Sequence, residues 1–343
     1  MDSHKSFGSD NHAGAHEAVL RALVQANSGD ANAYGADPWT DRATASLRTA
    51  FGARGGVFFV FTGTAANVLG LSLLLRPYEA VICPETGHMH VDECGAPERI
   101  LGSKLLTVAT PDGKLTPGLI APRLDWRGDE HRVQARVVAI SQVTELGTCY
   151  SLDELKQLGE FCRGEGLLLY VDGARLANAA AHLGCSLADL AAHADVLSFG
   201  GTKNGAVGAE AVVVMSEELA AGAPFLRKQQ SQLASKMRYL AAQFLGLLEG
   251  ELWLRNASHA NAMARRLADG IQDVPGVKLR QAVESNAVFA ALPPAHIARL
   301  QELWNFYIWD PSAHMVRWMT AFDTAEADVD AFIADVWRTA EPR

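Results

Sequence analysis

Residues 137–172 read VVAISQVTELGTCYSLDELKQLGEFCRGEGLLLYVD. Two short apolar runs, Val137–Ile140 and Leu167–Val171, enclose a polar loop and a helical pattern. Ser151, followed three residues later by Glu154, predicts a capping box at the start of that helix. The apolar runs are continuous rather than alternating, which is typical of strands covered on both faces in a parallel sheet. This strand–helix–strand unit therefore indicates an α/β fold.

The same unit repeats over residues 57–215, which predicts a sheet of about seven mostly parallel strands wrapped by helices. One of these helices is expected to open at Thr64 and to end before Pro77. The expected strands are Val57–Phe61, Ala80–Cys83, Lys104–Val108, Val137–Ile140, Leu167–Val171, Val196–Phe199 and Ala211–Met215.

After residue 219 the pattern changes to long helices and short strands, which predicts a smaller C-terminal α+β domain. The helices are expected at about 229–254, 257–271 and 325–340, and the strands near Val277, Val288 and Val316. We expect a large α/β domain at residues 15–250, and a small α+β domain at residues 251–343 together with 1–14.

The composition limits the class of protein. Of the 343 residues, 49% are hydrophobic and 20% are charged, which excludes a disordered chain. A formal net charge of -9 argues against nucleic acid as a ligand. Five cysteines without a CxxC pair disfavour a disulfide framework or a zinc ribbon and fit a reducing cytoplasm. The polar N-terminus and the lack of about 18 consecutive apolar residues predict a cytoplasmic protein with no membrane partner.

In open α/β sheets, ligands bind beyond the carboxyl ends of the strands, so the residues that follow each strand are candidate site residues. After the first strand, Thr62, Gly63 and Thr64 offer hydroxyls and free N–H groups at a helix N-terminus, as in a phosphate cradle. The alternative is an ordinary capped turn. The segment lacks the lysine and the spacing of a standard nucleotide loop.

Asp172 directly follows a buried strand, and Arg175 lies three residues further on. An aspartate there can hold a cationic ring nitrogen, and an arginine can bind a carboxylate through two hydrogen bonds. The alternative is that the two residues simply pair with each other.

Lys203 lies in a glycine-rich loop after another strand, beside Thr202, a candidate phosphate donor. In a dry cleft its amine can lose its charge and form an imine with a carbonyl. The alternative is an ordinary solvated lysine.

Titratable residues are dense at 85–95, after the second strand. His88 and His90 with Asp92 or Glu93 suggest metal ligands, but no further ligands with familiar spacing occur, so we expect no metal. An imidazole packed flat on an aromatic ring is the other functional interpretation, and an acidic surface turn is the non-functional one. Taken together, the cradle, the aspartate, the lysine and His88 indicate a site for pyridoxal 5'-phosphate.

Several short motifs also occur together, namely Ser9-Asp10, Tyr34-Gly35-Ala36-Asp37, Thr62-Gly63-Thr64-Ala65-Ala66-Asn67, His88 with Glu93-Cys94-Gly95-Ala96, Asp172-Gly173-Ala174-Arg175-Leu176 and Gly201-Thr202-Lys203-Asn204. On these motifs the chain resembles, over essentially its whole length, the threonine aldolase family of fold-type I pyridoxal-phosphate enzymes. Residues 92–98 and 235–238 look most like the branch that holds phenylserine aldolase and bacterial low-specificity L-threonine aldolases.

The resemblance implies an aldolase that cleaves the Cα–Cβ bond of L-threonine, L-allo-threonine or phenylserine to give glycine and an aldehyde. The implied catalytic residues are Lys203 (the Schiff-base lysine), Asp172 (the partner of the pyridine nitrogen), His88 (stacked on the cofactor) and His131 (near the substrate hydroxyl). The implied cofactor-binding residues are Thr62, Gly63, Thr64, His88, Asp172, Arg175, Thr202, Lys203 and Arg238. Ser9, Arg175 and Arg317 match positions that bind the substrate carboxylate. Either His88 or His131 is the candidate base for the β-hydroxyl proton.

Arg238 matches an arginine that reaches the phosphate from the neighbouring subunit, which implies a homodimer or a dimer of dimers. The chain departs from the family pattern at two places. The lysine expected before that arginine is replaced by a more distant Lys228, and residues 142–147 replace the usual asparagine- and histidine-containing turn. We expect the second departure to change the pocket for the substrate side chain.

Two other classes share some of these features. A β-eliminating lyase or an amino-acid racemase would use the same lysine, aspartate and phosphate turn. A cofactor-free α/β binding protein is the non-enzyme alternative.

Overall fold

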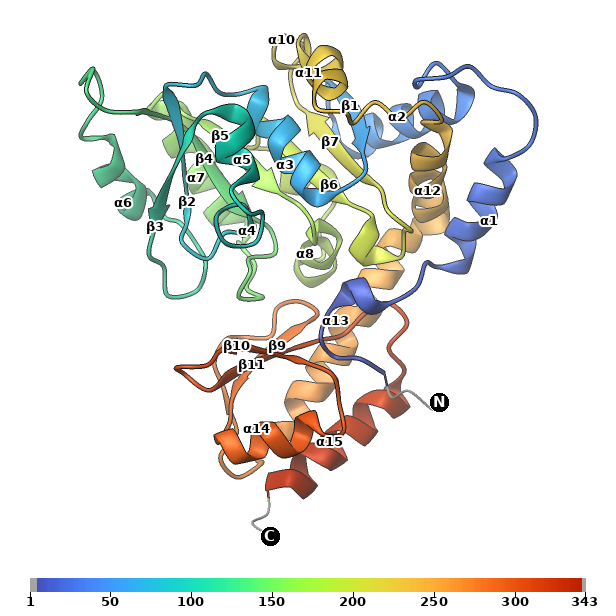
Figure 1. The fold of residues 1–343 in the computed structure, drawn as a ribbon, viewed down its shortest axis with the longest axis vertical. Helices are drawn as coiled ribbons and strands as arrows, with labels where there is room; N and C mark the ends of the chain where they lie inside the picture. The colour runs from blue at the N-terminus through green and yellow to red at the C-terminus, as the bar shows by residue number, and fades with distance from the viewer. Residues whose placement is uncertain (1–4, 341–343) are drawn as a thin grey trace.

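The computed structural model describes residues 5–340, so residues 1–4 and 341–343 of the expected small domain lie outside the described residues. Its main feature is a seven-stranded sheet in the order β1-β7-β6-β5-β4-β2-β3 (Figure 1). The strands are β1 Gly56–Val60, β2 Glu79–Pro84, β3 Lys104–Val108, β4 Gln134–Ser141, β5 Leu168–Asp172, β6 Val196–Gly200 and β7 Glu210–Val214. Only β7 runs antiparallel to its neighbours. The predicted α/β fold with seven mostly parallel strands is confirmed.

Helices cover both faces of this sheet, as the continuous apolar strands predict. Along β5, Leu169 and Val171 pack in one apolar cluster with α2, α7 and α12, whereas Tyr170 packs in another with α3. The helices are α1 Glu17–Ala26, α2 Pro38–Phe51, α3 Gly63–Ser72, α4 His88–Val91, α5 Ala96–Leu101, α6 Pro117–Ile120, α7 Leu152–Gly164, α8 Leu176–Leu183, α9 Leu187–Ala191, α10 Glu217–Ala220, α11 Ala223–Gln229, α12 Arg238–Leu248, α13 Leu252–Ile271, α14 Pro294–Gln301 and α15 Glu326–Ala340.

The capping signals decide where two of these helices begin. The Ser151 capping box at α7 is confirmed, since Ser151 Oγ accepts from the N–H of Glu154 and the Glu154 carboxylate accepts from the N–H of Ser151. The expected start of α3 at Thr64 is late by one residue, since the helix begins at Gly63. Thr62 is the cap, because its hydroxyl accepts from the N–H of Ala65 at 3.1 Å.

The single helix expected over 229–254 is also wrong, because α11 ends at Gln229 and α12 begins at Arg238. In the segment between them, Ser231 has a φ of 62° and the Gln232 side chain accepts a hydrogen bond from the N–H of Phe61. A second break follows at Gly250, with a φ of 55°. These interruptions depend on tertiary contacts that helical periodicity does not report.

The C-terminal part forms a four-stranded antiparallel sheet in the order β10-β11-β9-β8, with α13, α14 and α15 beside it (Figure 1). Its strands are β8 Lys278–Leu279, β9 Ala287–Ala291, β10 Tyr307–Asp310 and β11 Met315–Met319, of which β10 is not among the expected strands. The N-terminal segment joins this part, since Phe7 packs against Trp304 and Phe332 in the apolar cluster. The proposed division at residue 250 stays a prediction.

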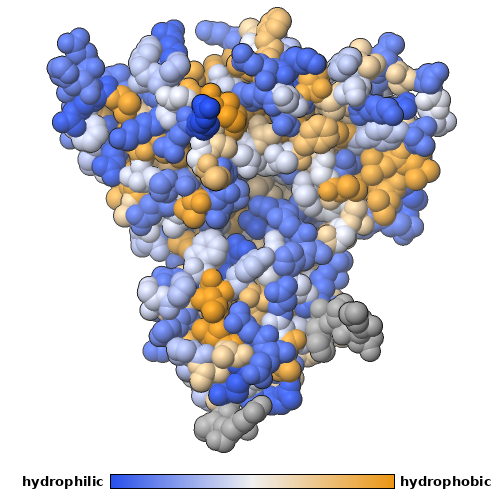
Figure 2. Space-filling model, viewed as in Figure 1, coloured by the Kyte–Doolittle hydropathy of each residue, from blue (hydrophilic) through white to orange (hydrophobic). Residues whose placement is uncertain are grey.

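The face shown in Figure 2 mixes polar and apolar residues and carries an apolar area over α1, where Leu20 and Val24 are exposed. Among residues 5–340, no helix combines the length and apolarity that a membrane span requires.

Candidate active site

A cavity lies at the edge of the large sheet where the parallel strands end. It is lined by Gly63, Asn67, His88, Ser141, Val143, Glu145, Asp172, Ala174, Arg175 and Lys203. The segments that follow β1, β2, β4, β5 and β6 all contribute to it. The sheet therefore brings together Gly63, His88, Asp172, Arg175 and Lys203, all of which the sequence singles out.

Lys203 lies in a short 3-10 turn, Thr202–Asn204, directly after β6. The chain approaches its neighbours closely here, because a Cβ atom on Gly200 would lie 2.6 Å from the carbonyl oxygen of Ala174. Burial lowers the pKa of the Lys203 amine, and the charge of Arg175 lowers it further. The amine forms no hydrogen bond or ion pair with any residue that the structure describes, so it remains available as a nucleophile.

Asp172, the last residue of β5, is held by two hydrogen bonds. Its Oδ1 accepts from the N–H of Ala174 at 3.0 Å, and its Oδ2 accepts from Asn67 Nδ2 at 2.8 Å. Asn67 itself is fixed, because its Oδ1 accepts from the hydroxyl of Tyr170 at 2.8 Å. The carboxylate is thus buried and oriented, and each of its oxygens keeps a lone pair for a further donor.

His88 begins α4 and is tied to a buried carboxylate. Its Nδ1 lies 2.8 Å from Glu93 Oε1, which also accepts from Asn67 Nδ2 at 2.6 Å. The hydrogen bond to Glu93 raises the pKa of His88. With Nδ1 bound to Glu93 as the donor, Nε2 is the ring nitrogen left to accept a proton. Within the described part of the chain, no three His, Cys, Asp or Glu side chains lie together in a way that could hold a metal ion.

The start of α3 offers backbone donors to the cavity. The N–H groups of Gly63 and Thr64 have no acceptor within residues 5–340, and a Cβ atom at Gly63 would find no atom within 4 Å. Open space therefore faces two unpaired donors at a helix N-terminus, the arrangement that binds phosphate.

Thr202, the other hydroxyl proposed for the phosphate, has a different partner. Its Oγ1 donates to Glu210 Oε1 at 2.6 Å. Glu210 reaches this edge because β7 is antiparallel and starts where its neighbours end. Burial raises the pKa of Glu210 to about 7. While this hydrogen bond holds, the hydroxyl proton of Thr202 cannot be donated to a phosphate.

Arg175 pairs with Asp10 rather than with Asp172. Its Nε donates to Asp10 Oδ2 at 2.6 Å and its Nη2 to Oδ1 at 2.9 Å. Burial opposes ionisation of Asp10, but the charge and hydrogen bonds of Arg175 lower its pKa to about 2. The guanidinium is therefore oriented by two hydrogen bonds and keeps N–H groups for a ligand.

Arg317 on β11 is a second partly buried cation, near enough to Arg175 for their charges to interact. Burial lowers the pKa of Arg317 to about 10. Its Nη2 donates to the carbonyl oxygen of Gly8 at 3.3 Å, whereas its Nε has no partner among the described residues. The neighbouring Ser9 caps a short 3-10 turn. An anion is the ligand that this pair of arginines requires.

The comparisons with known proteins agree with this geometry. A family model described as beta-eliminating lyase matches residues 6–293. The chain belongs to this family. Low specificity L-threonine aldolases of Pseudomonas sp. (strain NCIMB 10558) and Pseudomonas aeruginosa are each 46% identical to it, over 98% and 94% of both chains. The solved structure of Leishmania major threonine aldolase matches with a TM-score of 0.93 at 32% identity, covering 98% of this chain and 99% of that one. The predicted resemblance to threonine aldolases is confirmed.

Like its family, the chain uses pyridoxal 5'-phosphate, and the residues present fit that cofactor. Lys203 supplies an unpaired amine, and Asp172 an oriented carboxylate for a ring nitrogen. The unpaired donors of Gly63 and Thr64 supply the phosphate contacts. When bound, the cofactor supplies an electron sink for the bond broken at the substrate Cα.

Two residues assigned to the site from the family resemblance, His131 and Arg238, lie apart from the cavity, as does Lys228, to which no role was assigned. His131 is exposed and precedes the amino end of β4, at the opposite edge of the sheet, so within one chain it does not reach the substrate. Arg238 donates to the carbonyl oxygen of Gly29 at 3.0 Å, and the Lys228 amine lies 5.2 Å from the ring of Tyr34. For Arg238, a role at a partner's site stays a prediction.

Sequence reasoning assigned no role to several residues that hold the site, namely Asp10, Asn67, Ser141, Glu145 and Glu210, and it considered Glu93 only as a metal ligand. Some carried a signal, since Asp10, Asn67 and Glu93 lie within motifs that mark the family, and Glu145 lies in the turn that departs from it. Glu210 had none, because nothing in the sequence indicates that β7 reverses direction.

Proposed function

We propose that the protein is an aldolase that cleaves the Cα–Cβ bond of β-hydroxy-α-amino acids to give glycine and an aldehyde. One observation carries the proposal: Lys203, Asp172 and His88 line a single cavity in a chain that is 46% identical to low specificity L-threonine aldolases. The expected substrates are L-threonine, L-allo-threonine and phenylserine.

The substrate carboxylate binds to Arg175 and Arg317, with Ser9 beside them. Arg317 has an unpaired Nε, and Arg175 is held in place by Asp10, so both cations are oriented before the substrate arrives. Fixing the carboxylate determines which bond at Cα lies in the reactive orientation, and that choice selects the reaction.

His88 is the base that we assign to the β-hydroxyl proton. Its Nδ1 is bound to Glu93, so its Nε2 is the proton acceptor, and the raised pKa strengthens it as a base. Removing that proton allows the aldehyde carbonyl to form as the Cα–Cβ bond breaks. Asp172 would hold the ring nitrogen of the bound cofactor and stabilise positive charge there, which would favour the same step.

We also propose a homodimer or a dimer of dimers in which Arg238 reaches the phosphate of the neighbouring subunit. The matched arginine of the family and the distance of Arg238 from its own chain's cavity support this. The proposed compartment is the cytoplasm, which the five free cysteines support.

The test is a panel of amino acids given to the purified, cofactor-loaded enzyme. Glycine with acetaldehyde from the threonines, or with benzaldehyde from phenylserine, is the expected result. Pyruvate from serine without glycine would replace the proposal with β-elimination, and interconversion of enantiomers would replace it with racemisation.

A further inference from the structure

Glu145 lines the cavity beside His88 and Asp172, yet no step above uses it. Its Oε1 accepts two hydrogen bonds, from the N–H of His88 at 2.8 Å and from Ser141 Oγ at 2.6 Å. Its Oε2 is buried and has no hydrogen-bond partner within residues 5–340. A buried carboxyl oxygen without a partner lowers stability, so a ligand atom is expected to complete it.

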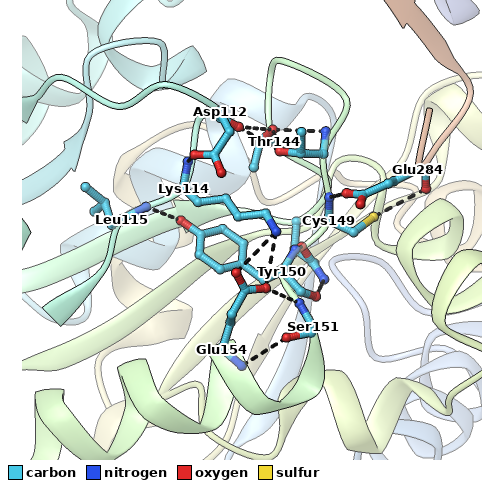
Figure 3. A network of polar contacts seen from close by, with 11 residues as sticks. Asp112, Lys114, Leu115, Thr144, Cys149, Tyr150, Ser151, Glu154 and Glu284 are labelled. Carbon is cyan, nitrogen blue, oxygen red and sulfur yellow. Dashed lines mark hydrogen bonds and ion pairs between the residues drawn. The ribbon is translucent and has the colours of Figure 1, made fainter. Parts of the chain in front are cut away.

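The turn that carries Glu145 is anchored from outside the cavity (Figure 3). The N–H of Cys149 donates to Glu284 Oε2 at 2.7 Å, and the hydroxyl of Tyr150 accepts from the N–H of Leu115 at 2.6 Å. Closer to Glu145, the N–H of Thr144 donates to the carbonyl oxygen of Thr148 at 2.9 Å. The carboxyl group therefore stands on a turn whose position is fixed before any ligand binds.

The polar groups of the cofactor and of the substrate indicate which ligand atom Glu145 Oε2 would contact. The phosphate has the donors at Gly63 and Thr64, the ring nitrogen has Asp172, and the aldehyde has Lys203. The substrate carboxylate has the two arginines, and it would be repelled by a second carboxylate. Two hydroxyl groups remain: the ring hydroxyl of the cofactor, and the β-hydroxyl of the substrate, whose proton is assigned to His88 but whose oxygen has no protein partner.

We propose that Glu145 is a further ligand-binding residue of this cavity, and that its Oε2 forms a hydrogen bond with a hydroxyl oxygen of the bound ligand. If the partner is the β-hydroxyl of the substrate, the assignment rests on the proposed function. If the partner is the ring hydroxyl of the cofactor, the assignment requires only that the cofactor binds. Burial raises the pKa of Glu145, so its carboxyl group can hold a proton more readily than an exposed one.

Three variants test this assignment. Glu145→Ala removes the carboxyl group, whereas Glu145→Gln keeps an oxygen for His88 and Ser141 and turns an amide that can only donate towards the cavity. Glu284→Ala is the matched control, because it loosens the same turn from outside and leaves Oε2 in place. Thermal unfolding and circular dichroism show whether each variant is folded. If Glu145→Ala does not fold, Glu145→Gln takes its place in the comparison with the wild type.

The cofactor is measured by titrating each apoenzyme with pyridoxal 5'-phosphate and recording the visible absorption band. If the ring hydroxyl is the partner, Glu145→Ala weakens cofactor binding by about tenfold, the effect of one hydrogen bond, and shifts the band. In that case binding of serine and alanine to the loaded enzyme changes equally.

The substrate is measured by the initial spectral change when each loaded enzyme is mixed with L-serine or L-alanine, which differ only by the β-hydroxyl. If that hydroxyl is the partner, Glu145→Ala weakens serine binding by about tenfold and leaves alanine and the cofactor within about twofold. Glu145→Gln matches Glu145→Ala if the ligand hydroxyl donates, and matches the wild type if Glu145 donates.

The assignment is overturned if a folded Glu145→Ala changes neither cofactor affinity nor the serine-to-alanine ratio by more than about twofold. It is equally overturned if Glu284→Ala gives the same losses, since the turn and not Oε2 would then be responsible. Failure of the wild type to release glycine from threonine is a separate result, which refutes the aldolase proposal and leaves this comparison of variants valid.

Discussion

Replacing Asp10 by asparagine tests how Arg175 is held in the site. Asp10 is 2% exposed and binds Arg175 through both oxygens, and Asn286 donates to it as well. Its pKa is about 2, against an ordinary value of 3.8. That difference corresponds to about 2.5 kcal/mol, since one pKa unit is worth about 1.4 kcal/mol. Because Asp10→Asn also leaves the partly buried guanidinium of Arg175 without a counter-charge, we expect a loss of about 3 kcal/mol in the free energy of unfolding.

The pH dependence of this loss has a defined sign. The folded-state pKa of Asp10 is depressed, so its contribution is complete above about pH 3.8 and disappears as the pH falls through about 2. The difference between the wild type and Asp10→Asn should therefore be constant in the neutral range and shrink only in acid.

Urea unfolding of the two proteins at neutral pH and at about pH 3, which lies between the two pKa values, measures the effect. Asp323→Asn is the matched control, because Asp323 pairs with Lys5 at a site that is 37% exposed. Exposed pairs contribute about 0–1 kcal/mol, so Asp323→Asn should cost less than about 1 kcal/mol. If Asp10→Asn costs no more than Asp323→Asn, the ion pair does not hold Arg175 as argued.

Three further predictions follow from single side chains. Lys203→Ala should abolish the visible band of the bound cofactor and lower cleavage by at least about 10³-fold, and borohydride treatment should leave no reduced adduct on the variant. Glu93→Gln should move the titration of the His88 ring, followed by NMR, to lower pH, because the hydrogen bond to Glu93 is what raises the pKa of His88; an unchanged titration would contradict that cause. Glu210 has a folded-state pKa of about 7 against 4.5, so the folded protein holds the extra proton and its stability falls as the pH rises from about 4.5 to 7. Glu210→Gln should remove that part of the decline in urea unfolding, and an identical pH profile would show that Glu210 does not titrate there.

Local chemistry explains which parts of the fold were predictable. All seven strands of the large sheet were predicted, because a run such as Val196–Phe199 is apolar on both faces and bounded by turn residues. The start of α7 at Ser151 was predicted because a capping box lies within four residues. The break between α11 and α12 was missed because it depends on a hydrogen bond from Phe61 to Gln232, 171 residues away.

The same distinction applies to the site. Asp172 and Lys203 could be predicted because each lies at or just beyond the carboxyl end of a strand, and these ends meet at one edge of a parallel sheet. The side chains that orient the site residues lie far from them along the chain. Asp10, which binds Arg175, is 165 residues from it, and Asn67, which binds Asp172, is 105 residues from it. The structure places His131 at the opposite edge of the sheet from the cavity of the same chain, since a motif reports spacing in sequence and not which end of a strand the residue occupies; its role stays a prediction.

Hydrogen-bonding capacity separates the residues that hold this site from those that bind its ligands. The proton of Thr202 is committed to Glu210, and both amide hydrogens of Asn67 are committed to Glu93 and Asp172, so these side chains support others. The Lys203 amine and Arg317 Nε have no partner among the described residues, although burial makes an unpaired polar atom costly. Lys203 and Glu145 also line the cavity, where a ligand can complete these atoms, and for that reason Glu145 Oε2 belongs with the ligand-binding groups rather than with the framework.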